Sequence, residues 1–243
     1  MTDYKRIVVL TGAGISAESG LATFRGPDGL WEGHRVEDVA TPEAFARDPD
    51  LVHNFYNLRR AALASVAPNP AHFALARLEK ELAARGCQLL LVTQNVDDLH
   101  ARAGSTQLIH MHGELMRGWC RACDARFPWA GAMGQGSPCP ACGRAGFVRP
   151  DIVWFGEMPY AMDRIDEALA ACDLFVSIGT SGNVYPAAGF VSAVRYYRKA
   201  HTLELNLEPS VGSAHFHEAR HGPAGVLVPQ WVASLHISCP SRI

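Results

Sequence analysis

The amino-acid sequence predicts an α/β fold in which a parallel sheet is covered by helices on both faces. Short apolar, β-branched runs recur along the chain, and the stretches that separate them are long enough for crossover helices. The chain has 243 residues, of which 48% are hydrophobic and 19% are charged. It can therefore bury one large domain, or one domain with a small satellite module.

Five runs are expected to form the strands of this sheet, because each has the length and the apolar composition of a buried strand. They are residues 6–10, 88–93, 107–110, 173–178 and 202–207. Since open α/β sheets bind ligands at the carboxyl ends of their strands, the residues that follow these runs are the first site candidates.

Three helices are expected between the strands. The first opens at Asn69, places Leu75, Leu78 and Leu82 on one face, and ends before Gly86, which has the position of a C-capping glycine. The other two are expected over residues 161–171 and 187–199.

Two segments break the alternation of strands and helices. Residues 20–41 are rich in glycine and charge, and residues 118–147 hold four of the seven cysteines. Long irregular stretches inside compact α/β proteins are usually functional loops or inserted modules. Both segments are therefore candidate sites.

The charge balance and the apolar runs disfavour several classes of protein. The sequence has 22 basic and 24 acidic residues, a net charge of −2 and no dense basic block, so stable nucleic-acid binding is not expected. No apolar run approaches the roughly 18 residues of a membrane-spanning helix. The first strand-like run begins at once, with no signal or transit peptide before it. We expect a soluble, cytoplasmic protein that does not bind membranes.

A glycine-rich turn follows the first run. Residues 12–17 read Gly-Ala-Gly-Ile-Ser-Ala, and such small residues let a backbone turn approach a pyrophosphate at a helix N-terminus. A tight turn without a ligand is the alternative interpretation. No acidic residue follows where a dehydrogenase grips the ribose, and Thr23, Phe24 and Arg25 occupy that stretch instead. An adenine dinucleotide fits this pattern, whereas hydride transfer fits it less well.

Two Cys-x-x-Cys pairs predict a structural zinc site. Cys120 and Cys123 are separated by 15 residues from Cys139 and Cys142, a spacing typical of a four-cysteine zinc ribbon. Four thiolates complete a tetrahedral zinc ion and leave no position for a catalytic water. Two local disulfides or a redox pair explain the cysteines less well, because neither requires two pairs at this spacing.

Polar residues follow the second and third runs. Gln94, Asn95 and Asp97 stand at a strand end where ligands bind, although Asn95 or Asp97 alone would also serve as a helix N-cap. His110 and His112 end the next run, and side-chain alternation along a strand would place both on one face. We expect a general base among them, the alternative being a structural histidine.

These motifs, taken in order, resemble those of the sirtuins, a family of NAD-dependent protein lysine deacylases, and in particular the bacterial members of class III. The resemblance covers about residues 7–228. It rests on residues 12–16, 20, 23–25, 94–97 and 112–113, on the four cysteines, and on residues 150–157, 179–181 and 206–208.

The resemblance implies a single catalytic unit over residues 1–243 that has two parts. The large part is a Rossmann-like NAD-binding domain made of residues 1–32, 70–117 and 149–243. The small part combines a helical insertion, residues 33–69, with the zinc ribbon, residues 118–148. NAD and an acyl-lysine protein or peptide would meet between the two parts.

In sirtuins NAD is a co-substrate. The acyl oxygen displaces nicotinamide from the ribose, and a histidine base then activates a ribose hydroxyl that attacks the intermediate, which leaves free lysine and an O-acyl-ADP-ribose. The resemblance implies that His112 is the base and that Asn95 and Asp97 hold the nicotinamide and ribose, so these three are the expected catalytic residues. Glu208 would supply the ribose contact that is missing after the first turn.

The residues expected around NAD share the turns that follow the strands and the loop that would close over the co-substrate. They are Gly12, Ala13, Gly14, Ser16, Thr23, Phe24, Arg25, Trp31, Gln94, Asn95, Val96, Asp97, Gly179, Thr180, Ser181, Asn206, Leu207, Glu208 and Ala224.

Two segments resemble the flanks that pair with the backbone of a peptide substrate, a binding mode that tolerates many peptide sequences. Their expected substrate-binding residues are Val153, Phe155, Gly156, Glu157, Asn183 and Val184.

The acyl group is expected to meet Tyr56 and Arg59, which match the Tyr-x-x-Arg of class III sirtuins. At this spacing the two side chains lie on one face of a helix, and a guanidinium with a phenol suits a carboxylate. Ala40 matches the small residue that widens the acyl pocket of that class. Succinyl and malonyl groups are therefore expected to be preferred over acetyl. The alternative is an Arg59 whose stem simply packs on an aromatic ring.

Two other functions stay open at the level of the sequence. A protein mono-ADP-ribosyltransferase would share the release of nicotinamide but would pass the ribose to a protein side chain. A non-catalytic NAD-sensing zinc protein would have no need of the His112 base.

Overall fold

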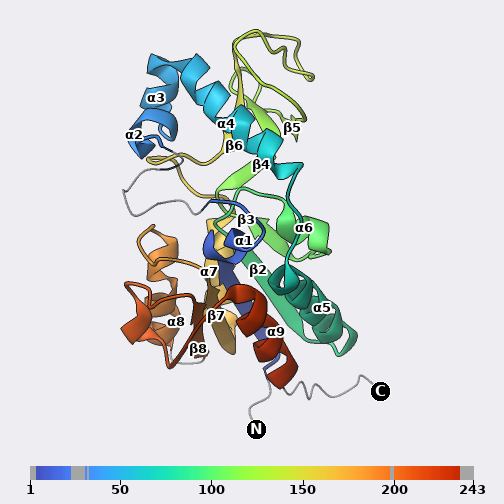
Figure 1. The fold of residues 1–243 in the computed structure, drawn as a ribbon, viewed down its shortest axis with the longest axis vertical. Helices are drawn as coiled ribbons and strands as arrows, with labels where there is room; N and C mark the ends of the chain where they lie inside the picture. Colours follow the sequence, from blue (N-terminus) through green and yellow to red (C-terminus); the bar gives the residue numbers. More distant parts are fainter. Residues whose placement is uncertain (1–3, 23–30, 32, 198–199, 236–243) are drawn as a thin grey trace.

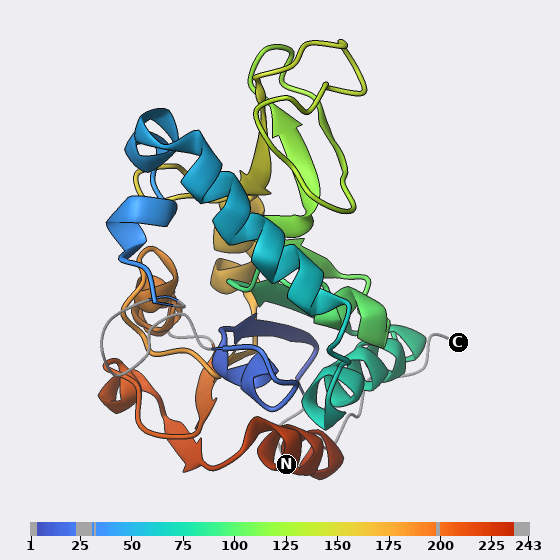
Figure 2. The same cartoon turned by 45° about the horizontal axis from the view of Figure 1, so that its top comes forward.

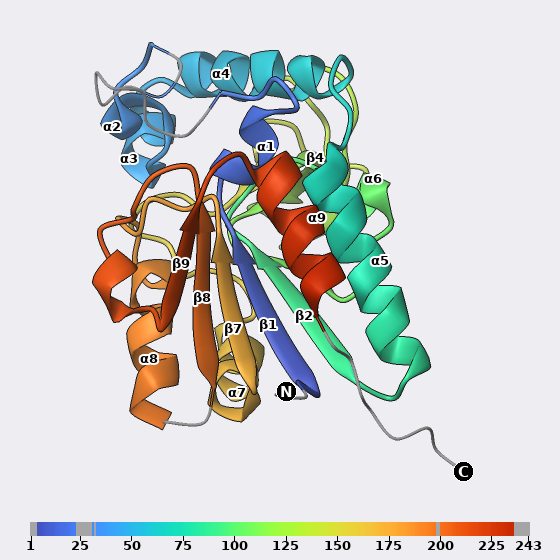
Figure 3. The same ribbon diagram turned by 60° about the horizontal axis from the view of Figure 1, so that its bottom comes forward.

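The computed structural model describes residues 4–22, 31, 33–197 and 200–235. Its larger sheet has six parallel strands in the order β3-β2-β1-β7-β8-β9 (Figure 3). The strands are β1 (Arg6–Thr11), β2 (Gln88–Thr93), β3 (Leu108–His110), β7 (Leu174–Ile178), β8 (His201–Asn206) and β9 (Glu218–His221). The five expected strands are confirmed. The edge strand β9 escapes the sequence pattern because its residues, Glu-Ala-Arg-His, contain no apolar run.

Helices cover both faces of this sheet, as predicted (Figure 3). Alternate residues of β1 face opposite sides: Ile7 and Val9 pack in one apolar cluster, and Val8 and Leu10 pack in another. The first cluster lies under α5 (Pro70–Ala84) and α9 (Ala224–Ser234), and the second under α7 (Met162–Ala171) and α8 (Phe190–Tyr197).

The helix α5 begins and ends as its sequence predicts. The side chain of Asn69 accepts a hydrogen bond from the N–H of Ala71 at 3.0 Å, and the N–H of Asn69 donates to Nδ1 of His72 at 3.2 Å. This reciprocal cap stabilises the first turn. Gly86 follows the helix with a φ of +75°, and the three expected core leucines are fully buried.

A second packed unit lies beyond the carboxyl ends of the large sheet (Figures 1 and 2). Its antiparallel sheet has the order β5-β4-β6, and three helices pack beside it. These elements are α2 (Val36–Val39), α3 (Pro42–Arg47), α4 (Pro49–Leu63), β4 (Gly113–Cys120), β5 (Arg126–Pro128) and β6 (Val148–Ile152). Phe45, Phe55 and Tyr56 from the helices pack with Leu115 and Trp154 in one core, so the two stretches of sequence form one unit.

The remaining elements are short. They are α1 (Gly14–Ala17), α6 (Leu99–Ala103), and the 3₁₀ turns η1 (Ala187–Gly189) and η2 (Ser213–His215). The helix expected over residues 187–199 begins as η1 and continues as α8, and residues 198–199 lie outside the described ranges. None of the described helices has the length and the apolar composition needed to cross a lipid bilayer.

Candidate active site

The strand order of the large sheet reverses between β1 and β7, and open α/β sheets bind ligands in the crevice at such a point. The turns after these strands meet there, since the N–H of Gly14 donates to the carbonyl of Gly179 at 2.8 Å. A Cβ atom on Gly12 would lie 2.7 Å from that carbonyl oxygen, and a Cβ on Gly179 would lie 2.7 Å from the carbonyl carbon of Gly14. The two turns therefore require glycine in order to touch.

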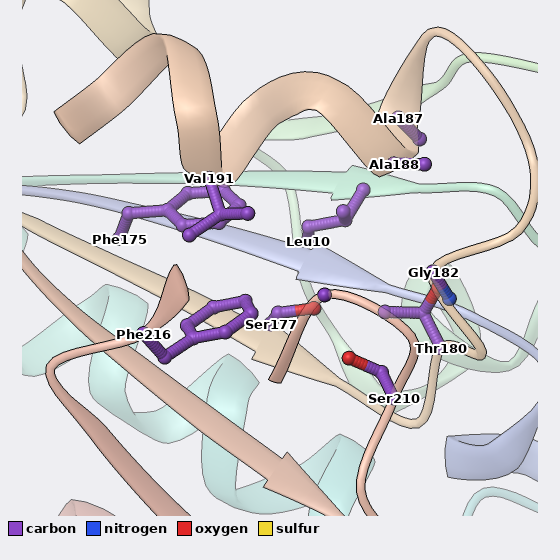
Figure 4. Close-up of a pocket in the computed structure, with 11 residues that line it drawn as sticks. Leu10, Phe175, Ser177, Thr180, Gly182, Ala187, Ala188, Val191, Ser210 and Phe216 are labelled. Atoms are coloured by element: carbon purple, nitrogen blue, oxygen red, sulfur yellow. The ribbon is translucent and has the colours of Figure 1, made fainter. Parts of the chain in front are cut away.

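A small cavity lies beneath the turn that follows β7. Figure 4 shows Ser177, Thr180 and Ser210 on one side of it and Phe175 and Phe216 on the other. Its volume is 20 Å³, which holds about one water molecule. This cavity is therefore too small for a nucleotide.

Three polar side chains from separate parts of the sequence converge beside the switch point. Ser16 donates a hydrogen bond to Oδ2 of Asp97 at 3.0 Å and accepts one from Nδ2 of Asn95 at 3.1 Å. All three residues are buried. His72 joins them, with its Nε2 atom 3.5 Å from Oγ of Ser16. The structure thus brings together Ser16, Asn95 and Asp97, each of which the sequence singled out.

His72 is a member of this cluster that the sequence analysis missed. Its Nδ1 accepts the N–H of Asn69, so the neutral ring carries its proton on Nε2 and donates it to Ser16. Burial lowers the pKa of His72 to about 4, which keeps the ring neutral at neutral pH. His72 does not follow a strand, so the rule that places site residues at strand ends does not select it. Its one sequence signal is its position three residues after Asn69, the residue that caps the helix.

The carboxylate of Asp97 is buried among protein donors. Burial raises its pKa, and hydrogen bonds from the N–H of Leu99, at 3.1 Å, and from Ser16 oppose this shift. Each carboxylate oxygen therefore has a donor from the protein. The group is held in one orientation at the end of β2.

His112 has the geometry of a general base. Its Nδ1 lies 3.1 Å from the carbonyl oxygen of Gln94, an acceptor, so the neutral ring carries its lone pair on Nε2. Burial lowers the pKa of His112, and the hydrogen bond to Gln94 opposes that shift. The ring is therefore neutral, and able to accept a proton, at neutral pH.

The expectation that His110 and His112 share one face of a strand is wrong. β3 ends at His110, and Met111 and His112 form a turn before β4, so strand alternation does not extend to His112. His110 instead places Nδ1 at 3.5 Å from the carbonyl of Asn95 and Nε2 at 3.9 Å from the carboxylate of Glu114.

Hydrogen bonds between the strand ends tie the expected NAD residues together. Nε2 of Gln94 donates to Oγ1 of Thr180 at 3.2 Å, and Nδ2 of Asn206 donates to the carbonyl of Thr180 at 2.9 Å. Ala224 is the first residue of α9. Ala13, Val96, Ser181, Leu207 and Glu208 lie on the same set of turns, with Leu207 and Glu208 exposed just after β8. Thr23, Phe24 and Arg25 lie outside the described residues.

The expected peptide-binding segment is fixed at both ends. The N–H of Val153 donates to the carbonyl of His112 at 2.9 Å, and the N–H of Phe155 donates to the carbonyl of Ala40 at 3.0 Å. Gly156 follows with a φ of +88°. The segment therefore runs directly past the turn that holds His112. Asn183 and Val184 lie on the loop after β7, at the switch point.

Glu157, the last residue of that segment, is engaged inside the protein. It forms an ion pair with the buried Arg149 at 2.6 Å and accepts the N–H of Trp154 at 2.8 Å. Arg149 also donates to the carbonyl of Ile152 at 2.6 Å. These contacts fix the segment to the protein interior, so the role that the structure shows for Glu157 is to hold the segment in place.

The two residues expected to meet the acyl group lie in one aromatic cluster. Tyr56 is fully buried, and its hydroxyl accepts a hydrogen bond from Nε1 of Trp154 at 2.9 Å. The guanidinium carbon of Arg59 lies 3.2 Å from the ring centre of Phe55 and 5.2 Å from that of Trp31. The ring of Trp31 is also 6.1 Å from that of Tyr56. Arg59 thus packs on the ring of Phe55, as the alternative interpretation expects, and both Arg59 and Tyr56 lie near the ring of Trp31.

The four cysteines are positioned for a structural zinc ion. Their Sγ atoms all lie within 4.8 Å of one another, with Cys120 and Cys142 at 3.8 Å and Cys123 and Cys139 also at 3.8 Å. Four sulfurs bound tetrahedrally at about 2.3 Å from zinc lie about 3.8 Å apart. Two of the sulfur–sulfur distances therefore match a bound tetrahedral ion, and all four sulfurs lie close enough together to hold zinc.

Comparison with solved structures gives a close match to this architecture. A Sir2 homologue in complex with NAD superposes with a TM-score of 0.85 at 39% identity, over 95% of this chain and 89% of that one. A Sir2 complex with a p53 peptide and NAD+ superposes with a TM-score of 0.79 at 26% identity, over 95% and 93% of the two chains.

Sequence comparison extends this match over nearly the whole chain. The Sir2 family model matches residues 12–186. An NAD-dependent protein deacylase of Pasteurella multocida is 59% identical over 235 residues, 96% of this chain and 99% of the relative. A protein of the same name from Bdellovibrio bacteriovorus is 59% identical over 231 residues, 94% and 96% of the two chains. The protein therefore belongs to the Sir2 family and is an NAD-dependent protein deacylase.

Proposed function

We propose that this deacylase removes succinyl and malonyl groups from lysine side chains in preference to acetyl groups. The observation that carries the proposal is that Tyr56 and Arg59 both lie on α4 and both lie near the ring of Trp31. A guanidinium fork and a phenol hydroxyl together suit a carboxylate, and an acetyl group offers no carboxylate to bind. The carbonyl of Ala40 accepts a hydrogen bond from the N–H of Phe155, so the small side chain of Ala40 lies beside the proposed peptide-binding segment.

We infer that His112 is the general base. Nδ1 donates to the carbonyl of Gln94, and Nε2 accepts a proton from a ribose hydroxyl of the co-substrate. Asn95 and Asp97, which Ser16 holds together, bind the nicotinamide and ribose end. NAD supplies the electrophilic ribose carbon and the nicotinamide leaving group. The reaction consumes one water molecule from solvent, and its products are free lysine, nicotinamide and an O-acyl-ADP-ribose.

The turns at the switch point are the proposed diphosphate and adenosine site. Gly12, Gly14 and Gly179 let the two turns touch without side chains between them, and the joined backbone is the surface that we propose a diphosphate approaches. Asn206 ties the end of β8 to the same turns. The proposed NAD residues are those expected from the sequence, with residues 23–25 outside the described ranges.

We propose that the acyl-lysine peptide adds as a strand between residues 153–157 and 182–184. The first segment is not extended throughout, because residues 155–157 turn and the N–H of Glu157 donates to the carbonyl of Trp154 at 3.0 Å. Arg149 and Glu157 anchor it from within, so its outer edge is presented in a fixed position. Backbone pairing of this kind tolerates many peptide sequences. The peptide and NAD then meet between a large unit, proposed as residues 1–32, 70–117 and 149–243, and a small unit, proposed as residues 33–69 and 118–148. Residues 113–117 of β4 and 149–152 of β6 fall within the proposed large unit but pack with the helices of the small one.

Incubation with NAD and peptides carrying acetyl-, malonyl- or succinyl-lysine, followed by mass spectrometry, tests this proposal. We expect loss of the acyl group from all three peptides, with the highest kcat/KM for the acidic acyl groups. An acetyl preference would overturn the acyl assignment. A gain of ADP-ribose on the peptide in place of acyl loss would make the enzyme a mono-ADP-ribosyltransferase.

Arg59→Met tests the acyl assignment at a single residue. We expect the variant to lose about 2–4 kcal/mol of transition-state binding on succinyl-lysine, the cost of leaving a buried charge without its partner. Turnover of acetyl-lysine should change little. Arg77→Met is the matched control, because Arg77 is exposed on α5 and, among the residues that the structure describes, forms its ion pair with Glu81. An equal fall in both activities would make Arg59 a structural residue.

A further inference from the structure

The hydroxyl of Tyr56 has a single hydrogen-bond partner among the described residues, and that partner is Trp154. Nε1 of Trp154 lies 2.9 Å from Oη of Tyr56, and both side chains are buried. An indole N–H can only donate, so the phenol oxygen is the acceptor in this bond. The proton of Tyr56 is therefore directed away from Trp154, and no described residue accepts it.

Trp154 is itself held in place from several sides. The guanidinium carbon of Arg149 lies 3.3 Å from its ring centre, and the ring of Phe45 lies 5.2 Å away. Its backbone N–H donates to Glu157, which in turn forms the ion pair with Arg149. The direction of the indole N–H is consequently fixed by packing, by a cation–π contact and by a buried ion pair.

We propose that Trp154 is a positioning residue that determines acyl specificity through Tyr56. Its N–H occupies one lone pair of the phenol oxygen and so orients the phenol proton toward the distal carboxylate of a succinyl or malonyl group. A donor bond to the oxygen also strengthens the hydroxyl as a donor, because hydrogen bonds in a chain polarise one another. An acetyl group has no distal carboxylate, so the orientation of the Tyr56 hydroxyl does not strengthen its binding. The inference rests on the acyl preference proposed above.

Trp154→Phe tests this role, because phenylalanine keeps an aromatic ring against Arg149 and removes only the N–H and part of the ring. We expect kcat/KM on succinyl-lysine to fall about five- to twentyfold, mainly through KM, as is typical of one lost hydrogen bond to a group that binds charge. We expect the ratio of kcat/KM on succinyl-lysine to kcat/KM on acetyl-lysine to fall by about the same factor, because any effect on the peptide-binding segment itself weakens both substrates equally. An unchanged thermal unfolding midpoint would show that the fold is intact.

The matched control is Trp119→Phe. Trp119 also lies near Arg149, with its ring centre 5.0 Å from the guanidinium carbon, but its N–H donates to Asp124 at 2.8 Å. The same chemical change there should leave the ratio of succinyl to acetyl activity unaltered. A fall in that ratio equal to that of Trp154→Phe would overturn the proposal.

A double-mutant cycle with Tyr56→Phe decides whether Trp154 acts through the phenol. If it does, Trp154→Phe has no further effect on succinyl-lysine once the Tyr56 hydroxyl is absent. An equal effect in both backgrounds, or an equal loss on succinyl- and acetyl-lysine, would overturn the inference and leave the acyl assignment standing. A wild-type enzyme without acidic acyl preference would instead overturn the proposed function, and the inference with it.

Discussion

At the scale of single residues, the hydrogen bond of His112 to Gln94 sets which nitrogen can act as a base. We expect His112→Ala to lower kcat by about 10²–10⁴, the usual cost of removing a general base. NAD binding, measured by calorimetry, and the circular dichroism spectrum should be largely unchanged, because His112 lies in a short turn and the proposed base is needed only after nicotinamide leaves. Retained activity would move the base to His110.

The pKa of His112 gives a second prediction at this scale. A base must be unprotonated, and burial lowers the pKa of this ring below its ordinary value of about 6.5. The acid limb of the activity profile should therefore be centred below that ordinary value. A pH profile of kcat/KM on acetyl-lysine, whose acyl group does not titrate, measures this. An acid limb centred above about 6.5 would contradict it.

At the scale of elements, the contact between the turns after β1 and β7 builds the switch-point surface. Gly179 has a φ of +63°, and a Cβ there would lie 2.7 Å from the carbonyl carbon of Gly14. We expect Gly179→Ala to lower the free energy of unfolding by more than about 2 kcal/mol and to weaken NAD binding, because the strain and the clash push the turns apart.

Chemical denaturation and NAD titration of Gly179→Ala check this prediction. Gly136→Ala is the matched control, since an added Cβ at Gly136 would meet no atom within 4 Å. The control should change the free energy of unfolding by no more than about 0.5 kcal/mol. Equal stability of the two variants would show that the turns have room to separate.

At the scale of the whole molecule, Cys120 and Cys139 of the zinc site belong to a small core that is distinct from the core beneath the helices α2–α4. Cys139 is buried in the core of the ribbon with Phe127, Met133 and Val148. We expect the wild type to bind a single zinc ion tightly, and Cys139→Ser to lose it and to unfold at least the small unit, since structural zinc binding supplies folding free energy. Metal analysis and limited proteolysis measure both effects. A metal-free protein that is fully folded and active would refute the prediction.

Much of the fold follows from local sequence patterns. The strand-like runs, the cap at Asn69 and the cysteine spacing each depend on residues close together in the chain, and each appears in the structure. The rule of side-chain alternation along a strand does not apply to His112, because the chain turns after His110. The search for apolar runs does not find β9, since an edge strand need not be apolar.

The sequence by itself determined the chemical inventory of the candidate site: the turn glycines, the proposed base His112, the amide and carboxylate after β2, and the four thiols. Only the tertiary structure decided which of them touch. The pairing of Tyr56 with Trp154 spans 98 residues of sequence, and that of Ser16 with Asp97 spans 81. Contacts at such separations form because distant strands and helices bury a shared core, and no local periodicity encodes their partners.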